Sequence, residues 1–162
     1  MTEMPELHPN VVRVIAAAKE SGLDITTRRF PDGTKTAADA AAAIGVMVGQ
    51  IVKSLVFAVD GEIVMAFVSG ANQLDEQKLA TAAGGSVCSR VDADAVRNAT
   101  GYAIGGVPPF GHETKLRVFI DPDLLQYDEL WAAAGTWNDN FAISPSELVR
   151  VSAGTVVDLK RG

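Results

Sequence analysis

Cysteine and histidine are scarce in this chain. Its 162 residues include a single cysteine, Cys88, and two histidines, His8 and His112. One cysteine excludes an intrachain disulfide, and nothing around Cys88 indicates redox chemistry, so we expect it to be a small buried residue. Two histidines and one cysteine at unrelated spacings match no metal-binding pattern. We therefore expect no metal and no other cofactor.

Long apolar runs are also missing. No stretch approaches the roughly 20 apolar residues that a membrane span needs. Residues 1–6 are acidic and lack the basic and then apolar pattern of a signal peptide. These two absences predict a cytoplasmic protein with no membrane partner.

Positive charge is in the minority. The chain has 14 lysines and arginines against 20 aspartates and glutamates, a net charge of -6. This balance argues against broad electrostatic adhesion to nucleic acid or to anionic membranes. It leaves room for a local basic site, for which the candidates are Arg28, Arg29, Lys35, Lys53, Lys115 and Arg117.

Helical and strand patterns alternate along the chain, which predicts a single α/β domain over residues 1–162. Apolar residues make up 48% of the chain and aromatics only 6%, so we expect a core of small aliphatic side chains. The architecture that fits best is a mixed, partly closed, barrel-like β-sheet surrounded by helices. Periodicity, caps and turn residues predict helices over 9–19, 36–44, 75–83, 92–99, 122–134 and from 144, and strands over 25–30, 51–59, 62–68, 86–90, 116–120 and 155–159.

A single cation, Lys53, interrupts the apolar run at residues 51–59. The alternation of a strand places Lys53 on one face with Leu55 and Phe57, and neither face looks solvated. Burying an unpaired ammonium costs several kcal/mol, so such a charge needs an internal partner or a ligand. The alternative is that the lysine extends its head to water along an apolar stem. The strand by itself leaves both interpretations open.

A second unusual segment spans residues 101–112, with four glycines and two prolines. Glycine allows the backbone to approach a ligand closely, and proline fixes the chain direction. Such a loop can present rigid backbone groups to a cleft, or it can simply connect two elements. It is not a phosphate-binding loop, because no Gly-Lys-Ser/Thr follows the glycines.

The two features together resemble the YbaK family, also called the prolyl-tRNA-synthetase-associated editing domain family. The lysine strand is followed by a Gly-x-x-x-Pro stretch at 105–109 and then by Phe110, Gly111 and His112. The alanine-rich segment before Gly45 and the Ser-Pro-x-x-Leu start at residue 144 are also similar to family elements. The resemblance covers about residues 34–159.

This resemblance implies trans-editing, the hydrolysis of the ester between a wrong amino acid and the 3′ end of a tRNA. The resemblance implies that Lys53, Gly105 and Gly106 are the catalytic residues. We expect Lys53 to act as an electrostatic anchor. Some relatives carry an acidic residue at the position of Asn140, which has Asp139 beside it, so the amino acid that is recognised stays open. The expected substrate-binding residues are Ser69, Val107, Pro108, Pro109, Gly111, His112 and Asn140.

The expected partners are a mischarged tRNA, gripped at its acceptor 3′ end, and an aminoacyl-tRNA synthetase or an elongation factor that adds affinity. Two other functions fit the same residues. One is a non-catalytic module that binds a nucleotide or an amino-acid derivative in the same pocket, and the other is a hydrolase of a different small ester. Trp131 and Trp137 fit packing in the core or at its rim better than stacking on bases.

Overall fold

The computed structural model describes residues 7–162, so the acidic segment 1–6 lies outside the described residues. Two short 3₁₀ turns, η1 (Val48–Gln50) and η2 (Pro122–Gln126), accompany the α-helices. The helices are α1 (Pro9–Glu20), α2 (Ala37–Ile44), α3 (Glu76–Ala82), α4 (Ala93–Thr100) and α5 (Pro145–Ser152).

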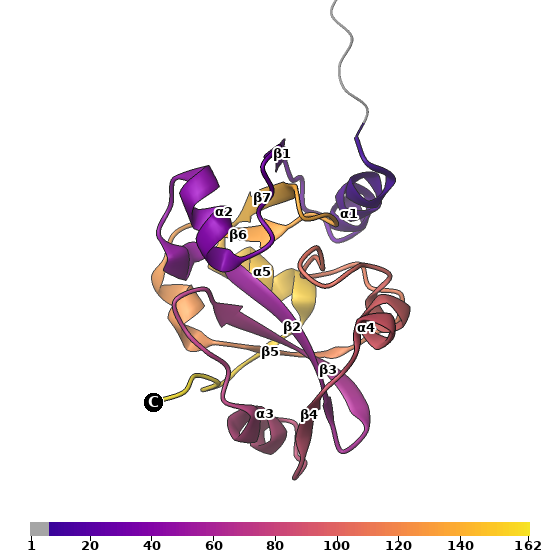
Figure 1. The fold of residues 1–162 in the computed structure, drawn as a ribbon, viewed down its shortest axis with the longest axis vertical. Helices are drawn as coiled ribbons and strands as arrows, with labels where there is room; N and C mark the ends of the chain where they lie inside the picture. Colours follow the sequence, from indigo (N-terminus) through magenta and orange to yellow (C-terminus); the bar gives the residue numbers. More distant parts are fainter. Residues whose placement is uncertain (1–6) are drawn as a thin grey trace, which may run out of the picture.

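The strands form two sheets (Figure 1), which confirms a mixed α/β fold. The larger sheet has the order β4-β2-β3-β5-β8, with antiparallel pairs around β2 and parallel pairs around β5. The smaller sheet is antiparallel, with the order β1-β7-β6. The strands are β1 (Thr27–Arg29), β2 (Val52–Val59), β3 (Glu62–Ser69), β4 (Cys88–Arg90), β5 (Arg117–Ile120), β6 (Leu130–Ala133), β7 (Asp139–Ile143) and β8 (Thr155–Val156).

Local signals fixed many of these elements as predicted. Thr36 caps α2 by accepting a hydrogen bond from the amide of Asp39, and Gly45 ends the helix in the left-handed conformation. The β2–β3 hairpin turns at Asp60 and Gly61, which both have positive φ, as a two-residue hairpin turn requires.

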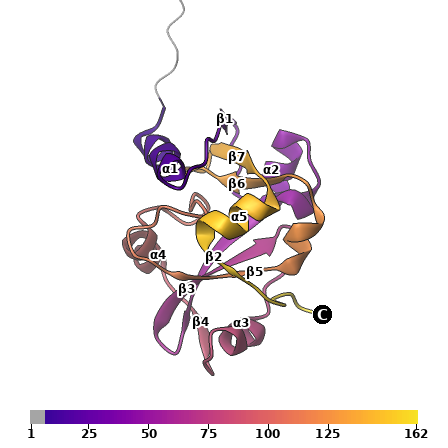
Figure 2. The same cartoon turned by 180° about the vertical axis from the view of Figure 1, so that it is seen from behind.

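The larger sheet is covered on both faces, because β3 alternates between two cores. Met65 and Phe67 pack into a cluster with α1, α4, α5 and the smaller sheet, whereas Val64 and Ala66 face α3. Figure 2 shows α5 lying over the sheet on the side opposite to that seen in Figure 1. The two-sided burial makes β3 a rigid support for its neighbour β2.

The helix predicted over residues 122–134 is wrong. Asp121 caps a start at Pro122, but the turn η2 stops at Gln126 and the chain then enters β6. Ala132 and Ala134, whose type favours helix, are buried in the core between the sheets, so tertiary packing decides the conformation here. Strand β7 was also not predicted, and the expected single sheet is divided into two sheets that do not close into a barrel.

The two sheets meet at the beginning of β2, where Ile51 forms an isolated parallel bridge with Trp131 of β6. On the same side of β2, pairing with β4 starts only at Phe57. Between these points, no strand within residues 7–162 pairs with this edge of β2. Among residues 7–162, no helix is long and apolar enough to cross a bilayer.

Candidate functional site

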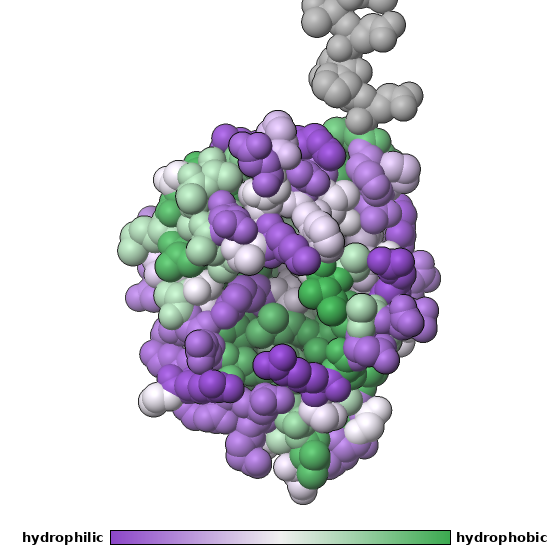
Figure 3. Space-filling view, in the orientation of Figure 1, coloured by the Kyte–Doolittle hydropathy of each residue, from purple (hydrophilic) through white to green (hydrophobic). Residues whose placement is uncertain are grey.

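Two cavities of about 530 and 290 Å³ lie along the open edge of β2. Consecutive strand residues line them, 53–57 in the larger cavity and 51–55 in the smaller, because the cavities reach around the edge to both faces of the strand. Figure 3 shows the hollow on this side of the molecule, with an apolar floor and hydrophilic side chains around it. Five residues line both cavities: Lys53, Ser54, Leu55, Ile104 and Val107.

The register of β2 also exposes backbone groups in this gap. The amide of Gly70 donates to the carbonyl of Ile51, so residues 51, 53 and 55 direct their backbone groups toward β3. The alternate residues, Ser54 and Val56, direct theirs toward the open edge. Unpaired strand groups of this kind are ready to bind a ligand or water.

Lys53 lies where the two cavities meet. Its Nζ donates a hydrogen bond to the backbone carbonyl of Asn72, and it forms no ion pair with any carboxylate of residues 7–162. Burial lowers the pKa of Lys53, and the negative charge of Asp121 opposes that shift. The side-chain amide of Asn72 in turn donates to Asp121 and to Asp123, which fixes the segment that holds the lysine.

Ser54 adds a polar group that the sequence did not single out. Its hydroxyl is buried and has no hydrogen-bond partner among residues 7–162. Because buried polar groups are nearly always hydrogen-bonded, this orphan hydroxyl, in a residue that lines both cavities, is not explained by contacts within the described residues.

The glycine loop closes the gap in the sheet opposite β2. Gly105, which has a φ of 87°, lines the smaller cavity, and a Cβ there would come within 3.1 Å of Trp137 and of Lys35. Gly106 faces the other side of the loop, where a Cβ would lie 3.1 Å from the backbone of Thr136. The glycines are therefore required both for the turn and for close packing against the β6–β7 connection.

Most of the second half of the loop lies outside both cavities. Pro108 and Pro109 are buried and line neither cavity, and Gly111 is exposed. His112 is half-buried and donates from Nε2 to the carbonyl of Pro108 over 2.6 Å. Burial lowers the pKa of His112, and this hydrogen bond opposes the shift. These residues support the loop from behind.

Asn140 lines the smaller cavity, and its amide donates to the hydroxyl of Thr34, which donates to the carbonyl of Trp137. Its neighbour Asp139 is buried away from both cavities and pairs with Arg29.

Ser69 lies outside both cavities. It is buried, its hydroxyl donates to the carbonyl of Gly49, and its amide donates to Asp121.

The structure therefore gathers Lys53, Gly105, Val107 and Asn140 of the predicted set at one smaller cavity. It also brings in residues outside the predicted set. Ile104 is half-exposed, directly precedes Gly105 and lines both cavities. Extending the glycine motif by one residue would have included it. Arg90 and Arg161 reach the larger cavity from distant parts of the chain, and no local pattern marks them.

The arrangement can stabilise negative charge and position water without a metal. Among residues 7–162, no cluster of three histidine, cysteine, aspartate or glutamate side chains is placed to hold a metal ion. Lys53, Ser54 and the outward-facing backbone groups of β2 border two cavities of small-molecule size.

Known proteins share this fold and sequence pattern. Residues 31–151 match the model of the aminoacyl-tRNA editing domain. The multifunctional Ser/Thr-tRNA deacylase ProXp-y of Escherichia coli (strain K12) is 29% identical over 170 residues, covering 99% of each chain. A proline–tRNA ligase of Maridesulfovibrio salexigens is 33% identical over 107 residues, which are 66% of this chain and 18% of the ligase.

A solved structure described as a candidate trans-editing enzyme for prolyl tRNA synthetase is 43% identical, with a TM-score of 0.92. The alignment covers 97% of this chain and 100% of that chain. These similarities confirm the resemblance inferred from the lysine strand and the glycine loop. The chain belongs to the aminoacyl-tRNA editing domain family.

Proposed function

We propose that this protein is an aminoacyl-tRNA deacylase that acts in trans, hydrolysing the ester of a mischarged tRNA. The observation that carries the proposal is the position of Lys53, a cation without a carboxylate partner among residues 7–162, on the wall shared by two cavities. Family membership and the deacylase relative of Escherichia coli support it.

In this proposal Lys53 is an electrostatic anchor. An ammonium has three N–H donors, of which the carbonyl of Asn72 uses one, so two are left for oxygens of the substrate. One such oxygen is the ester carbonyl, which gains negative charge when water attacks. Because an aminoacyl ester is already activated, charge stabilisation and a placed water are sufficient, and no strong nucleophile is needed.

The smaller cavity is the proposed site for the amino-acid side chain. Its walls combine the apolar Ala37, Ala40 and Ile51 with the polar pair of Asn140 and Thr34. The backbone of Gly105 borders it and holds the carbonyl carbon within reach of the attacking water. Water adds to that carbon, the carbon–oxygen ester bond breaks, and the ribose oxygen leaves with a proton.

The substrate partner is the acceptor 3′ end of a tRNA. The similarity to a segment of a proline–tRNA ligase supports an association with an aminoacyl-tRNA synthetase, and an elongation factor is the alternative partner. With a net charge of -6, the protein gains little from general attraction to RNA. Weak intrinsic tRNA binding is therefore expected, and a partner adds the missing affinity.

The test is a deacylation assay on tRNAs charged with alanine, cysteine, serine or threonine. We expect Lys53→Ala to slow release of at least one of these amino acids by about 100-fold or more, the usual effect of removing one charge-stabilising donor. Lys115→Ala is the matched control, because Lys115 is exposed and lines neither cavity.

Circular dichroism should show that Lys53→Ala keeps its fold. Equal rates for wild type and Lys53→Ala would refute the anchor role. If the wild type released no amino acid from any of the four tRNAs but bound a nucleotide or an amino-acid derivative, the protein would instead be a binding module.

A further inference from the structure

The larger cavity is cationic although the protein as a whole is acidic. Lys53, Arg90 and Arg161 all line it, and Glu76 is its one acidic residue among the described part of the chain. Six other lysines and arginines form ion pairs within residues 7–162, but none of these three does. The cavity therefore carries three cations against one carboxylate, and none of the three cations is ion-paired within residues 7–162.

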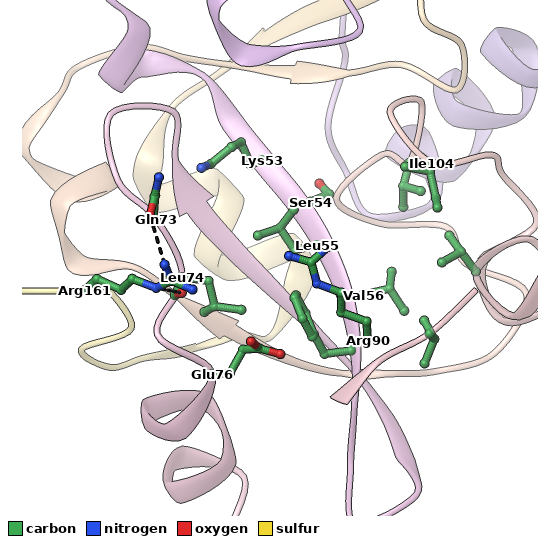
Figure 4. Close-up of a pocket in the computed structure, with 14 residues that line it drawn as sticks. Lys53, Ser54, Leu55, Val56, Gln73, Leu74, Glu76, Arg90, Ile104 and Arg161 are labelled. Carbon is green, nitrogen blue, oxygen red and sulfur yellow. Dashed lines mark hydrogen bonds between the residues drawn. The ribbon is translucent and has the colours of Figure 1, made fainter. Parts of the chain in front are cut away.

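The two arginines enter the cavity from opposite sides (Figure 4). Arg90 extends from the end of β4, and within residues 7–162 its guanidinium has neither an ion pair nor a hydrogen bond. Arg161 comes from the end of the chain and is held by the carbonyl of Leu74 and by the side chain of Gln73. Since Gln73 and Leu74 are neutral, Arg161 keeps its full charge for an anion.

Between the arginines the cavity has an apolar floor. The floor residues are Leu55, Val56, Phe57, Leu74, Val91, Val96 and Val107. A flat, weakly polar ring fits such a floor, and phosphates fit guanidinium groups, which bind them through paired N–H donors. Together these are the requirements of a nucleotide in a single strand.

We propose that the larger cavity binds the single-stranded nucleotides that precede the terminal adenosine of the tRNA. Arg90 and Arg161 contact their phosphodiesters, and a base lies on the apolar floor. This proposal rests on the proposed function, because Lys53 then marks the border between the nucleotide cavity and the amino-acid cavity. Such a cavity would give an acidic protein a small, local binding site for RNA.

The experiment measures binding of uncharged RNA, so it does not depend on hydrolysis. Fluorescence anisotropy with a labelled RNA that ends in CCA is recorded from 50 to 200 mM salt for wild type, Arg90→Gln and Arg161→Gln. Each variant should bind about 3- to 10-fold more weakly at low salt, and the slope of log affinity against log salt should fall by about 0.7. Arg90→Lys should restore part of the affinity.

Arg97→Gln is the matched control, because Arg97 is exposed on α4, forms no ion pair among the described residues and lines neither cavity. Its affinity and salt slope should equal those of wild type. The side chain of Arg90 forms no hydrogen bond or ion pair within residues 7–162, so Arg90→Gln should not disturb the fold. The result for Arg90→Gln therefore decides whether the proposal holds. Unchanged affinity and slope in Arg90→Gln, or an equal loss in Arg97→Gln, would overturn the proposal.

Competition with AMP separates an RNA strand from a free nucleotide. We expect the trinucleotide CCA to displace the labelled RNA at concentrations at least about 10-fold lower than AMP, since each further phosphate adds a contact. Equal potency of AMP would make the cavity a mononucleotide site and overturn the strand assignment. An absence of deacylation together with Arg90-dependent RNA binding would refute the proposed function and leave this inference standing.

Discussion

Ser54 is the residue whose environment is hardest to explain by folding alone. A buried hydroxyl without a partner costs about 1–3 kcal/mol, and Ser54 has no partner among residues 7–162 although it lies beside Lys53 on the shared wall. A serine in this position therefore lowers stability in the free protein. The cost is offset if the hydroxyl binds water or substrate during the reaction.

Replacing this serine should separate stability from activity. We expect Ser54→Ala to keep or raise the melting temperature, because the orphan hydroxyl is removed, and to lower kcat/KM for deacylation by about 10-fold. Ser89→Ala is the control, as Ser89 is exposed on the neighbouring strand β4. A lower melting temperature with unchanged kcat/KM would assign the hydroxyl to the fold instead.

Among the connecting segments, the glycine loop is held next to Gly105 by the exposed side chain of Trp137. Trp137, on the β6–β7 connection, donates from its indole nitrogen to the carbonyl of Ile104 over 2.6 Å, and Lys35 lies 4.0 Å from the centre of its ring. The ring also packs against Gly105. The smaller sheet thus fixes the loop that faces the lysine strand.

Trp137→Phe keeps an aromatic ring and removes this hydrogen bond. A typical hydrogen bond contributes about 0.5–1.5 kcal/mol, so the fold should survive while the loop opens more often. We expect faster hydrogen exchange at the amide of Gly106, which donates to Ala103 within the loop, and a kcat/KM about 10-fold lower.

Exchange at the amides of α3, which lies on the far side of the larger sheet, provides the internal control. Faster exchange there as well would indicate general destabilisation rather than a loosened loop. No change at Gly106 would show that the indole hydrogen bond does not hold the loop.

Elements with local signals were predictable, and those set by distant contacts were not. The caps of α2 and the turn at Asp60 depend on a few adjacent residues, so the sequence contains what is needed. Strand β6 does not depend on adjacent residues alone. Leu130 and Ala132 are buried between two sheets that come together only in the folded protein. Its alanine-rich sequence favours the helix that we predicted.

The site shows the same division. Lys53 and the glycine loop stand out in the sequence because a cation in an apolar strand and four glycines near two prolines are locally unusual. Arg90 and Arg161 are ordinary arginines until the β2–β4 pairing and the C-terminal segment bring them to one cavity. The open edge of β2 is equally invisible in the sequence, since it depends on where two different strands stop pairing.

Across the whole molecule, the site lies along the part of β2 whose edge opposite β3 has no strand partner among residues 7–162. The Ile51–Trp131 bridge ends on one side and β4 begins on the other. The glycine loop spans this gap, and His112 supports the loop from behind through the carbonyl of Pro108. The stability of the fold near the site is therefore linked to the protonation of one histidine.

This link predicts how stability depends on pH. Burial lowers the pKa of His112 below its ordinary value of 6.5. Above pH 6.5 the ring is neutral in both states, and below it the unfolded chain takes up a proton before the folded protein does. Stability therefore falls as the pH drops from 6.5 to the lower pKa of the folded state, by at most about 1.4 kcal/mol per pH unit.

Guanidinium unfolding at pH 7.5, 6.5 and 5.5 measures this loss. Glu62 and Asp123 also have lowered pKa values, but these carboxyls titrate below their ordinary values of 4.5 and 3.8, outside this pH range. In His112→Gln, whose amide can still donate to Pro108, we expect a smaller loss of unfolding free energy between pH 6.5 and 5.5 than in wild type. Glutamine cannot take up a proton in this pH range. An identical loss in both proteins would therefore mean that the imidazole of His112 does not control acid stability.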